Sequence, residues 1–198
     1  GVLNLQNNTA TGTVAGGVTV ATGAALELQG GITVGAEALS INGTGVVGNG
    51  ALRNISGDNS WGGAVTLAGN SEIQSDAGTL TLNTVTGATR TLTFDGTGNG
   101  LIGGAITTTT GGLIKNGAGV LTLQGASTYT GATAVNVGVL NVRNAQGTGT
   151  VAGGVTVANH AALELQGGIT VGAEALTLSG AGVAANGALR NISGDNIW

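Results

Sequence analysis

The chain has 198 residues and a formal net charge of −4, and 41 of its residues are glycine, while proline, cysteine and methionine are absent. The aromatic residues are Trp61, Phe94, Tyr129 and Trp198. This composition excludes an ordinary globular core filled with aromatic side chains. Only 7% of the residues are charged, which also excludes the highly charged, weakly hydrophobic class of disordered chains.

The charged residues restrict the partners. Five basic residues are scattered singly along the chain, so no basic patch for a nucleic-acid backbone is present, and we expect no nucleic-acid partner.

Without cysteine there is no disulfide and no thiolate metal site. No apolar run is long enough to cross a bilayer, so we expect no membrane-spanning segment.

An internal repeat dominates the sequence. Residues 1–61 return as residues 138–198, displaced by 137 positions, with roughly 47 identities in 61 aligned pairs. The block A-A-L-E-L-Q-G-G-I-T-V-G-A-E-A-L is unchanged between Ala24–Leu39 and Ala161–Leu176. Repetition on this scale is typical of solenoids and arrays. We expect residues 1–198 to be one continuous solenoid segment, formed by one 137-residue unit and the start of the next, within a longer array.

Short strands are expected along the whole chain, each made of a small residue, a leucine, a polar residue and an apolar residue. In chain order they lie at residues 25–28, 38–41, 51–55, 79–82, 91–94, 120–123 and 139–142. Period-two alternation turns the leucines inward and the polar residues outward. The steps from Leu26 to Leu39 and from Leu39 to Leu52 are equal, but the step from Leu121 to Leu140 is longer, so we expect strands on different faces of one coil.

The turns between these strands are rich in Gly-Gly and Asn-Gly pairs, which accept positive φ at little cost. The absence of proline suits strands that are nearly all interior. No segment has apolar residues at helical spacing with proper caps. The sequence therefore predicts an all-β stack of coils with essentially no helix.

The most distinctive stretch is Gly111–Val142, which reads G-G-L-I-K-N-G-A-G-V-L-T-L-Q-G-A-S-T-Y-T-G-A-T-A-V-N-V-G-V-L-N-V. Its order of parts is Gly-Gly-Leu, a lysine, Asn-Gly-x-Gly, an apolar strand, a Thr-Tyr-Thr-Gly turn and Val-Asn-x-Gly-x-Leu. This order resembles the β-strand repeat associated with bacterial autotransporter passenger domains. The resemblance implies a right-handed parallel β-helix, or β-solenoid, on the surface of a bacterial cell or secreted from it.

No catalytic residue is predicted. A β-helix enzyme that cleaves polysaccharides would gather acids with Lys or Arg on one face, whereas several acids here are copies of one another: Glu27 and Glu164, Glu37 and Glu174, Asp58 and Asp195. Because an active site would be unique, duplication favours acids that are structural residues on the surface of the coils. Glu27 and Arg53 hold the same outward strand position, so we expect them to pair across coils, as Glu164 and Arg190 would.

No metal or cofactor is predicted either. The only histidine, His160, is replaced by Gly23 in the other copy, so we expect an exposed turn residue. The segment Asp95–Gly100, D-G-T-G-N-G, faintly resembles a calcium loop but lacks the bidentate acid that such a loop needs further on.

Two residue types keep a ligand-binding surface open as an alternative. Trp61 and Trp198 follow Gly-Asp-Asn-x in both copies, and we expect each to plug a wide corner rather than to stack on a sugar. Thr-x-Thr pairs resemble, weakly, the flat threonine arrays of ice-binding solenoids. A glycan or ice surface would need an outward column of threonines or an exposed Trp61.

The expected function is structural and adhesive: an extracellular stalk or fibre of a bacterial surface or secreted protein, similar to an autotransporter passenger, and not an enzyme. Its expected partners are neighbouring repeats of the same chain or end-to-end copies, with host-surface or matrix glycans as further candidates. A polysaccharide-active β-helix is the least favoured alternative.

Overall fold

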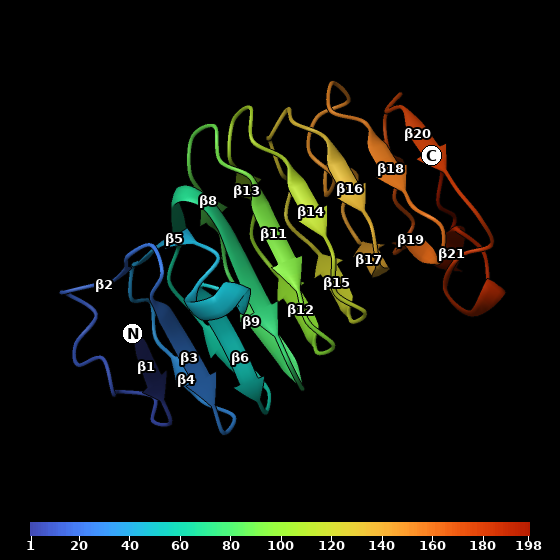
Figure 1. Cartoon of the computed structure of the whole chain (residues 1–198). Helices are drawn as coiled ribbons and strands as arrows, with labels where there is room; N and C mark the ends of the chain where they lie inside the picture. Colours follow the sequence, from blue (N-terminus) through green and yellow to red (C-terminus); the bar gives the residue numbers. More distant parts are fainter.

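The computed structural model describes residues 1–198 and forms a parallel β-solenoid of about eight turns. Figure 1 shows the strands stacked side by side from β1 at one end to β20 and β21 at the other. The prediction of an all-β parallel solenoid is confirmed. The only helical segments are two short 3₁₀ turns, Val46–Gly48 and Val183–Ala185, and neither of them could span a membrane.

Each coil passes three faces in turn. The first face runs the whole length of the solenoid and holds β1 (Val2–Leu5), β3 (Ala25–Gln29), β6 (Leu52–Ser56), the second half of β8 (Val65–Ser75), β11 (Leu92–Asp95), β14 (Leu113–Lys115), β16 (Thr133–Val135), β18 (Val155–Val157) and β20 (Leu176–Leu178).

The second face forms a separate sheet of β4 (Thr33–Val34), β7 (Asn59–Trp61), β9 (Thr79–Leu82), β12 (Asn99–Ile102), β15 (Val120–Leu123), β17 (Gly138–Val142), β19 (Ala161–Gln166) and β21 (Leu189–Ser193). The third face is shorter and holds β2 (Val18–Val20), β5 (Leu39–Gly43), the first half of β8, β10 (Val85–Thr86) and β13 (Ile106–Thr107). The long strand β8 turns the corner between the third face and the first.

The leucines predicted to point inward do so, but they divide among the three faces. Leu26, Leu39, Leu52 and Leu121 are each at most 1% exposed. Leu26 pairs with Leu52 one coil later on the first face, whereas Leu39 belongs to the third. The segment from Leu26 to Leu39 therefore contains half of the residues of one coil. The longer segment from Leu121 to Leu140 is one whole coil.

The core is a set of narrow columns along the solenoid axis, one residue per coil. On the first face one inward column consists of Leu3, Leu26, Leu52, Ile73, Phe94, Lys115, Val135, Val157 and Leu178. Stacking of this kind buries apolar surface that a single coil leaves exposed. The small average side chain suits an interior of this width.

Glycine marks corners where a side chain has no room. Gly138 has φ +72° at the start of β17, and a Cβ there would collide with the carbonyl oxygens of the preceding coil. Gly119 likewise lies against the backbone of Gly98. These corners bring consecutive coils close together and so set the positions of the strands that follow.

Candidate functional site

The predicted pairing of acids and arginines across coils is present in both copies. Arg53 Nη1 lies 3.3 Å from Glu27 Oε1, and Arg53 Nη2 lies 2.6 Å from Asp76 Oδ2. In the second copy Arg190 Nη1 lies 2.7 Å from Glu164 Oε1. The outward column also includes Asn4, which donates to Glu27 over 3.1 Å. These carboxylates are engaged in bonds that join neighbouring coils.

A second duplicated acid behaves differently, because Glu37 and Glu174 are buried, with 2% and 6% of their surfaces exposed. Glu37 accepts a hydrogen bond from the hydroxyl of Thr11, and Glu174 accepts one from Thr148 over 2.6 Å. Burial raises the pKa of Glu174. The expectation that duplicated acids decorate the coil surface is wrong for this pair, since both side chains lie inside a corner.

The tryptophans close the same corners. Trp61 is 1% exposed, and its Nε1 donates to the backbone oxygen of Glu37 over 2.7 Å. Trp198 makes the equivalent bond to Glu174 over 3.1 Å and is half-buried. Trp61 therefore plugs a corner, as predicted, and offers no platform to a sugar ring.

Beside Glu174 lies a buried polar chain. The Tyr129 hydroxyl bonds to Thr133 Oγ1 over 2.7 Å, and Thr133 Oγ1 donates to the backbone oxygen of Thr148 over 3.3 Å. Burial raises the pKa of the Tyr129 phenol. The Thr-Tyr-Thr turn of the sequence motif thus anchors one coil to the next through its fully buried tyrosine.

Lys115 is the only lysine and is fully buried in an inward column. Its ammonium donates to the backbone oxygen of Gly117 and lies 3.5 Å from that of Val137 and 6.0 Å from the centre of the Phe94 ring. Burial lowers its pKa to about 8. The carbonyl oxygens and the ring face replace the water that a buried ammonium has lost.

The candidate metal residues do not form a cluster, and no three His, Asp or Glu side chains gather as a metal site requires. In the Asp95–Gly100 turn, Asp95 Oδ1 accepts from the Gly96 amide over 2.6 Å and Asn99 Oδ1 accepts from the Val120 amide over 3.0 Å. His160 is exposed in a turn at φ 68°, where Gly23 has φ 76°.

The third face carries a hydroxyl column that the sequence pattern did not reveal. One outward residue from each of five successive coils aligns in it: Thr19, Ser40, Thr66, Thr86 and Thr107. The Thr66 and Thr86 hydroxyls are 3.1 Å apart. The column was missed because its coils differ in length, with more chain between Ser40 and Thr66 than between Thr66 and Thr86. Unequal spacing of this kind hides a periodic signal.

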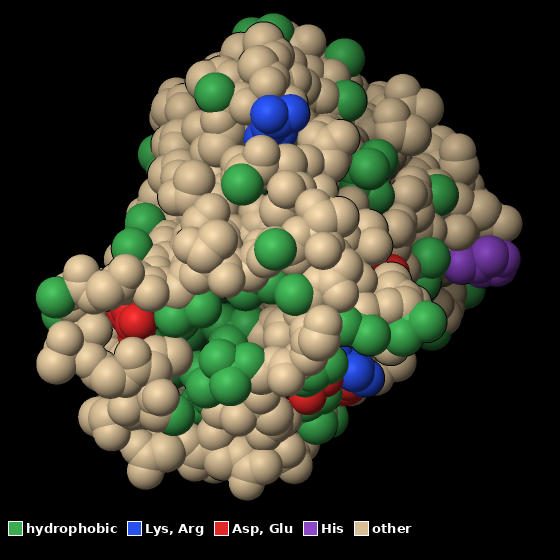
Figure 2. All heavy atoms as spheres, turned by 60° about the vertical axis from the view of Figure 1, so that its left-hand side comes forward, with side chains coloured by type: hydrophobic (Ala, Val, Ile, Leu, Met, Phe, Trp, Pro, Cys, Tyr) green, Lys and Arg blue, Asp and Glu red, His purple; other side chains and the backbone are tan.

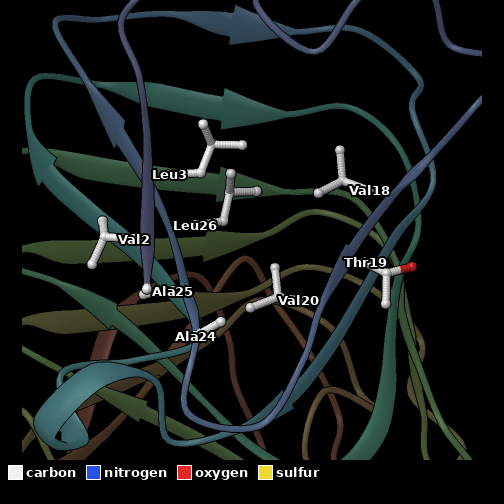
Figure 3. A pocket seen from close by; sticks show the side chains of 9 residues that line it. Val2, Leu3, Val18, Thr19, Val20, Ala24, Ala25 and Leu26 are labelled. Carbon is white, nitrogen blue, oxygen red and sulfur yellow. The ribbon is translucent and has the colours of Figure 1, made fainter.

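An apolar hollow lies at the β1 end. It has a volume of about 320 Å³ and is lined mainly by Val2, Leu3, Val18, Val20 and Leu26. Figure 2 shows hydrophobic side chains gathered in a hollow on this end of the molecule. In Figure 3, Leu3 and Leu26 lie on one side of the hollow and Val18 and Val20 on the other. The hollow has no charged side chain in its lining, so it fits an apolar surface and not a polar substrate.

Of three comparisons, only the one with protein-family models finds a match. Neither the curated proteins nor the solved structures include one that matches the chain. The family model of the passenger-associated-transport-repeat matches residues 73–90 and residues 113–142. The second stretch is the one singled out in the sequence, and the first shares its Gly-x-Leu-Thr-Leu core at Gly78–Leu82. Each stretch holds a first-face strand, a glycine corner and a second-face strand. The chain therefore carries the passenger-associated-transport-repeat at two places in its solenoid.

Proposed function

We propose that this segment is a stiff structural stalk within a bacterial surface or secreted protein of the autotransporter type, which holds an adhesive region away from the cell or builds an extracellular fibre. The passenger-associated repeat and the β-solenoid fold fit a structural passenger domain. The adhesive role and the location outside the cell belong to this proposal.

The observation that carries the proposal is the continuity of the backbone ladders. The first face joins nine strands from β1 to β20, and the second joins eight from β4 to β21. Bending such a rod strains the hydrogen bonds of both ladders at once. Stiffness therefore follows from the backbone and requires only small side chains.

The surroundings of the acids support a structural role over a catalytic one. Glu27, Asp76 and Glu164 bond to arginines, and Glu37 and Glu174 bond to threonine hydroxyls inside corners. Each of these bonds joins an acid to a residue of a neighbouring coil, as a structural role requires. We therefore favour a structural function over an enzymatic one.

The stalk proposal is tested by measuring how the length of the particle grows with the mass of the chain. Chains would be made in which residues 1–198 are followed by one, two or three further copies of residues 62–198, which preserves the natural junction after the tryptophan. Small-angle scattering and negative-stain microscopy should show rods of constant width that lengthen by about 30 Å per added unit, at about 4.8 Å per coil. Compact particles, whose radius grows only as roughly the 0.4 power of length, would contradict the proposal.

The adhesive part needs its own measurement. Beads coated with the 198-residue chain should not bind host cells by themselves if the segment is only a stalk. Strong binding by the coated beads would assign the adhesive surface to the solenoid itself.

The hydroxyl column favours a second candidate, a glycan-binding face. Its hydroxyls repeat at about 4.8 Å, and Thr66 and Thr86 lie at its centre. Binding to insoluble polysaccharides that falls at least tenfold in Thr66→Lys and in Thr86→Lys, and that is kept in Thr156→Lys on another face, would support this candidate. Equal binding by all three variants would remove it.

A further inference from the structure

The two copies of the repeated sequence provide a comparison within one molecule. Residues 1–4 and 138–141 have the same sequence, Gly-Val-Leu-Asn. Leu3 is 54% exposed in β1, whereas Leu140 is fully buried in β17. Val2 is 51% exposed and Val139 only 8%. The difference arises from the neighbouring coil, because β17 is covered by a strand on both sides and β1 on one side only.

The strand that covers β17 is β15. Val120 pairs with Val139, Leu121 with Leu140 and Leu123 with Val142. On its other side β17 pairs with β19 in the register that β1 keeps with β3, since Val2 pairs with Ala25 and Val139 with Ala162. The apolar hollow beside β1 is therefore the site that a Val120–Leu123 strand fills in the other copy.

The opposite end shows the same relation. Leu189 in β21 is 36% exposed, whereas its counterpart Leu52 in β6 is fully buried. Leu52 is covered by Ile73 of β8. Residues 62–137 thus contain both covering strands, β8 for one end of the repeated block and β15 for the other.

The copies do not lie on the same face. Strands β1, β3 and β6 belong to the first face, but their counterparts β17, β19 and β21 belong to the second. Strands β2 and β5 belong to the third face, and their counterparts β18 and β20 to the first. From β1 the chain makes six full turns to β16 and then advances by one more face to β17. One 137-residue unit is therefore six and a third turns.

We propose that 137-residue units of this sequence stack head to tail as one continuous coil, in which the first strand of each unit packs on the Val120–Leu123 strand of the unit before it and each unit is turned by one face relative to that unit. This arrangement rests on the proposed stalk function and specifies its geometry. The partner of the apolar hollow is another copy of the same unit. Three units return the sequence to its starting face after about 90 Å.

The rotation has a consequence for the surface. The Glu27–Arg53 pair lies on the first face and the Glu164–Arg190 pair on the second, so a third unit presents the pair on the third face. Each duplicated surface feature winds around the rod instead of forming a line. A stalk built in this way exposes the same features in every direction.

The experiment uses the chain of residues 1–198 followed by copies of residues 62–198. Because the protein has no cysteine, exposed Thr19 and its counterparts, of which Thr156 is the first, can each be replaced by cysteine and labelled with gold. Electron microscopy should show labels that step by about 30 Å along the rod and rotate by about a third of a turn at each step. The fourth label, three units after the first, should therefore lie on the same side of the rod as the first.

A matched control removes residues 92–112 from every unit, which deletes the single coil between Leu92 and Leu113. The axial step should shorten by about 4.8 Å with the rotation unchanged. Labels in a single line on rods that lengthen normally would overturn the rotation and leave the stalk standing. Failure of the rods to lengthen would instead overturn the stalk itself.

Discussion

Leu140 and Leu3 allow the contribution of inter-coil packing to be measured with local sequence held constant. Both leucines lie in Gly-Val-Leu-Asn, and both pair with a leucine in the following coil, Leu163 or Leu26. They differ in exposure, at 0% and 54%. Replacing each by alanine therefore removes the same atoms from two environments.

The expected losses are unequal. Leu140→Ala leaves a cavity between Leu121 and Leu163 and should lower the free energy of unfolding by about 2–5 kcal/mol, the range for buried leucines. Leu3→Ala removes carbon atoms that are already about half exposed to solvent, and it leaves no closed cavity. At about 0.8 kcal/mol per fully buried methylene, its loss should stay near 1 kcal/mol or below.

Urea unfolding followed by far-UV circular dichroism measures both variants. The midpoint should fall clearly for Leu140→Ala and only slightly for Leu3→Ala, with the slope unchanged in both. Equal losses, within about 0.5 kcal/mol, would refute the argument, because they would mean that the coil before β17 contributes nothing to the burial of Leu140.

Three further outcomes are expected. Trp61→Phe should cost about 1–3 kcal/mol, because it shrinks the corner plug and leaves the Glu37 oxygen without its donor; thermal unfolding measures it, with Trp198→Phe as the milder control. Glu27→Gln should cost less than about 1 kcal/mol, with the difference shrinking in high salt. The pKa of Lys115, lowered to about 8, means that stability rises with pH from about 8 to 10, where the unfolded lysine still binds a proton that the folded one has lost; Lys115→Met should abolish this rise in unfolding titrations.

The strands and their inward leucines could be predicted because alternation is a local property. Leu26 and Leu121 are each followed by a polar residue and then by another leucine, and each is buried as the alternation predicts. The same rule placed Glu27 and Arg53 outward at equivalent positions, and their ion pair followed from parallel stacking. What a strand presents to its two sides is thus encoded within the strand itself.

The assignment of strands to faces could not be predicted, because it depends on the sum of all preceding coil lengths. The coil that separates Val120 from Val139 is much shorter than the coil that separates Thr33 from Ser60. A small error in the length of one corner moves every later strand to another face. The hydroxyl column and the displacement of the second copy by one face both depend on this sum.

The buried acids escaped prediction for a related reason. Glu37 lies in a corner outside any strand, so strand alternation does not predict whether its side chain points inward or outward. Its duplication made it resemble Glu27, whose side chain points outward. Lys115 is the opposite case, because it is two positions after inward Leu113 in the same strand. Alternation therefore places the lysine inside, a position that its charge alone would not suggest.

The repeated block separates what sequence determines from what neighbours determine. Its two copies keep the same pairing register, including the shift after Leu28 and after Leu165, although they lie on different faces and at opposite ends. Register is therefore a property of the block itself. Exposure is not, since Leu3 and Leu140 differ only in the coil packed against them. A solenoid of this kind can extend by repeating one unit, because each unit brings its own register and needs only the preceding unit to bury its first strand.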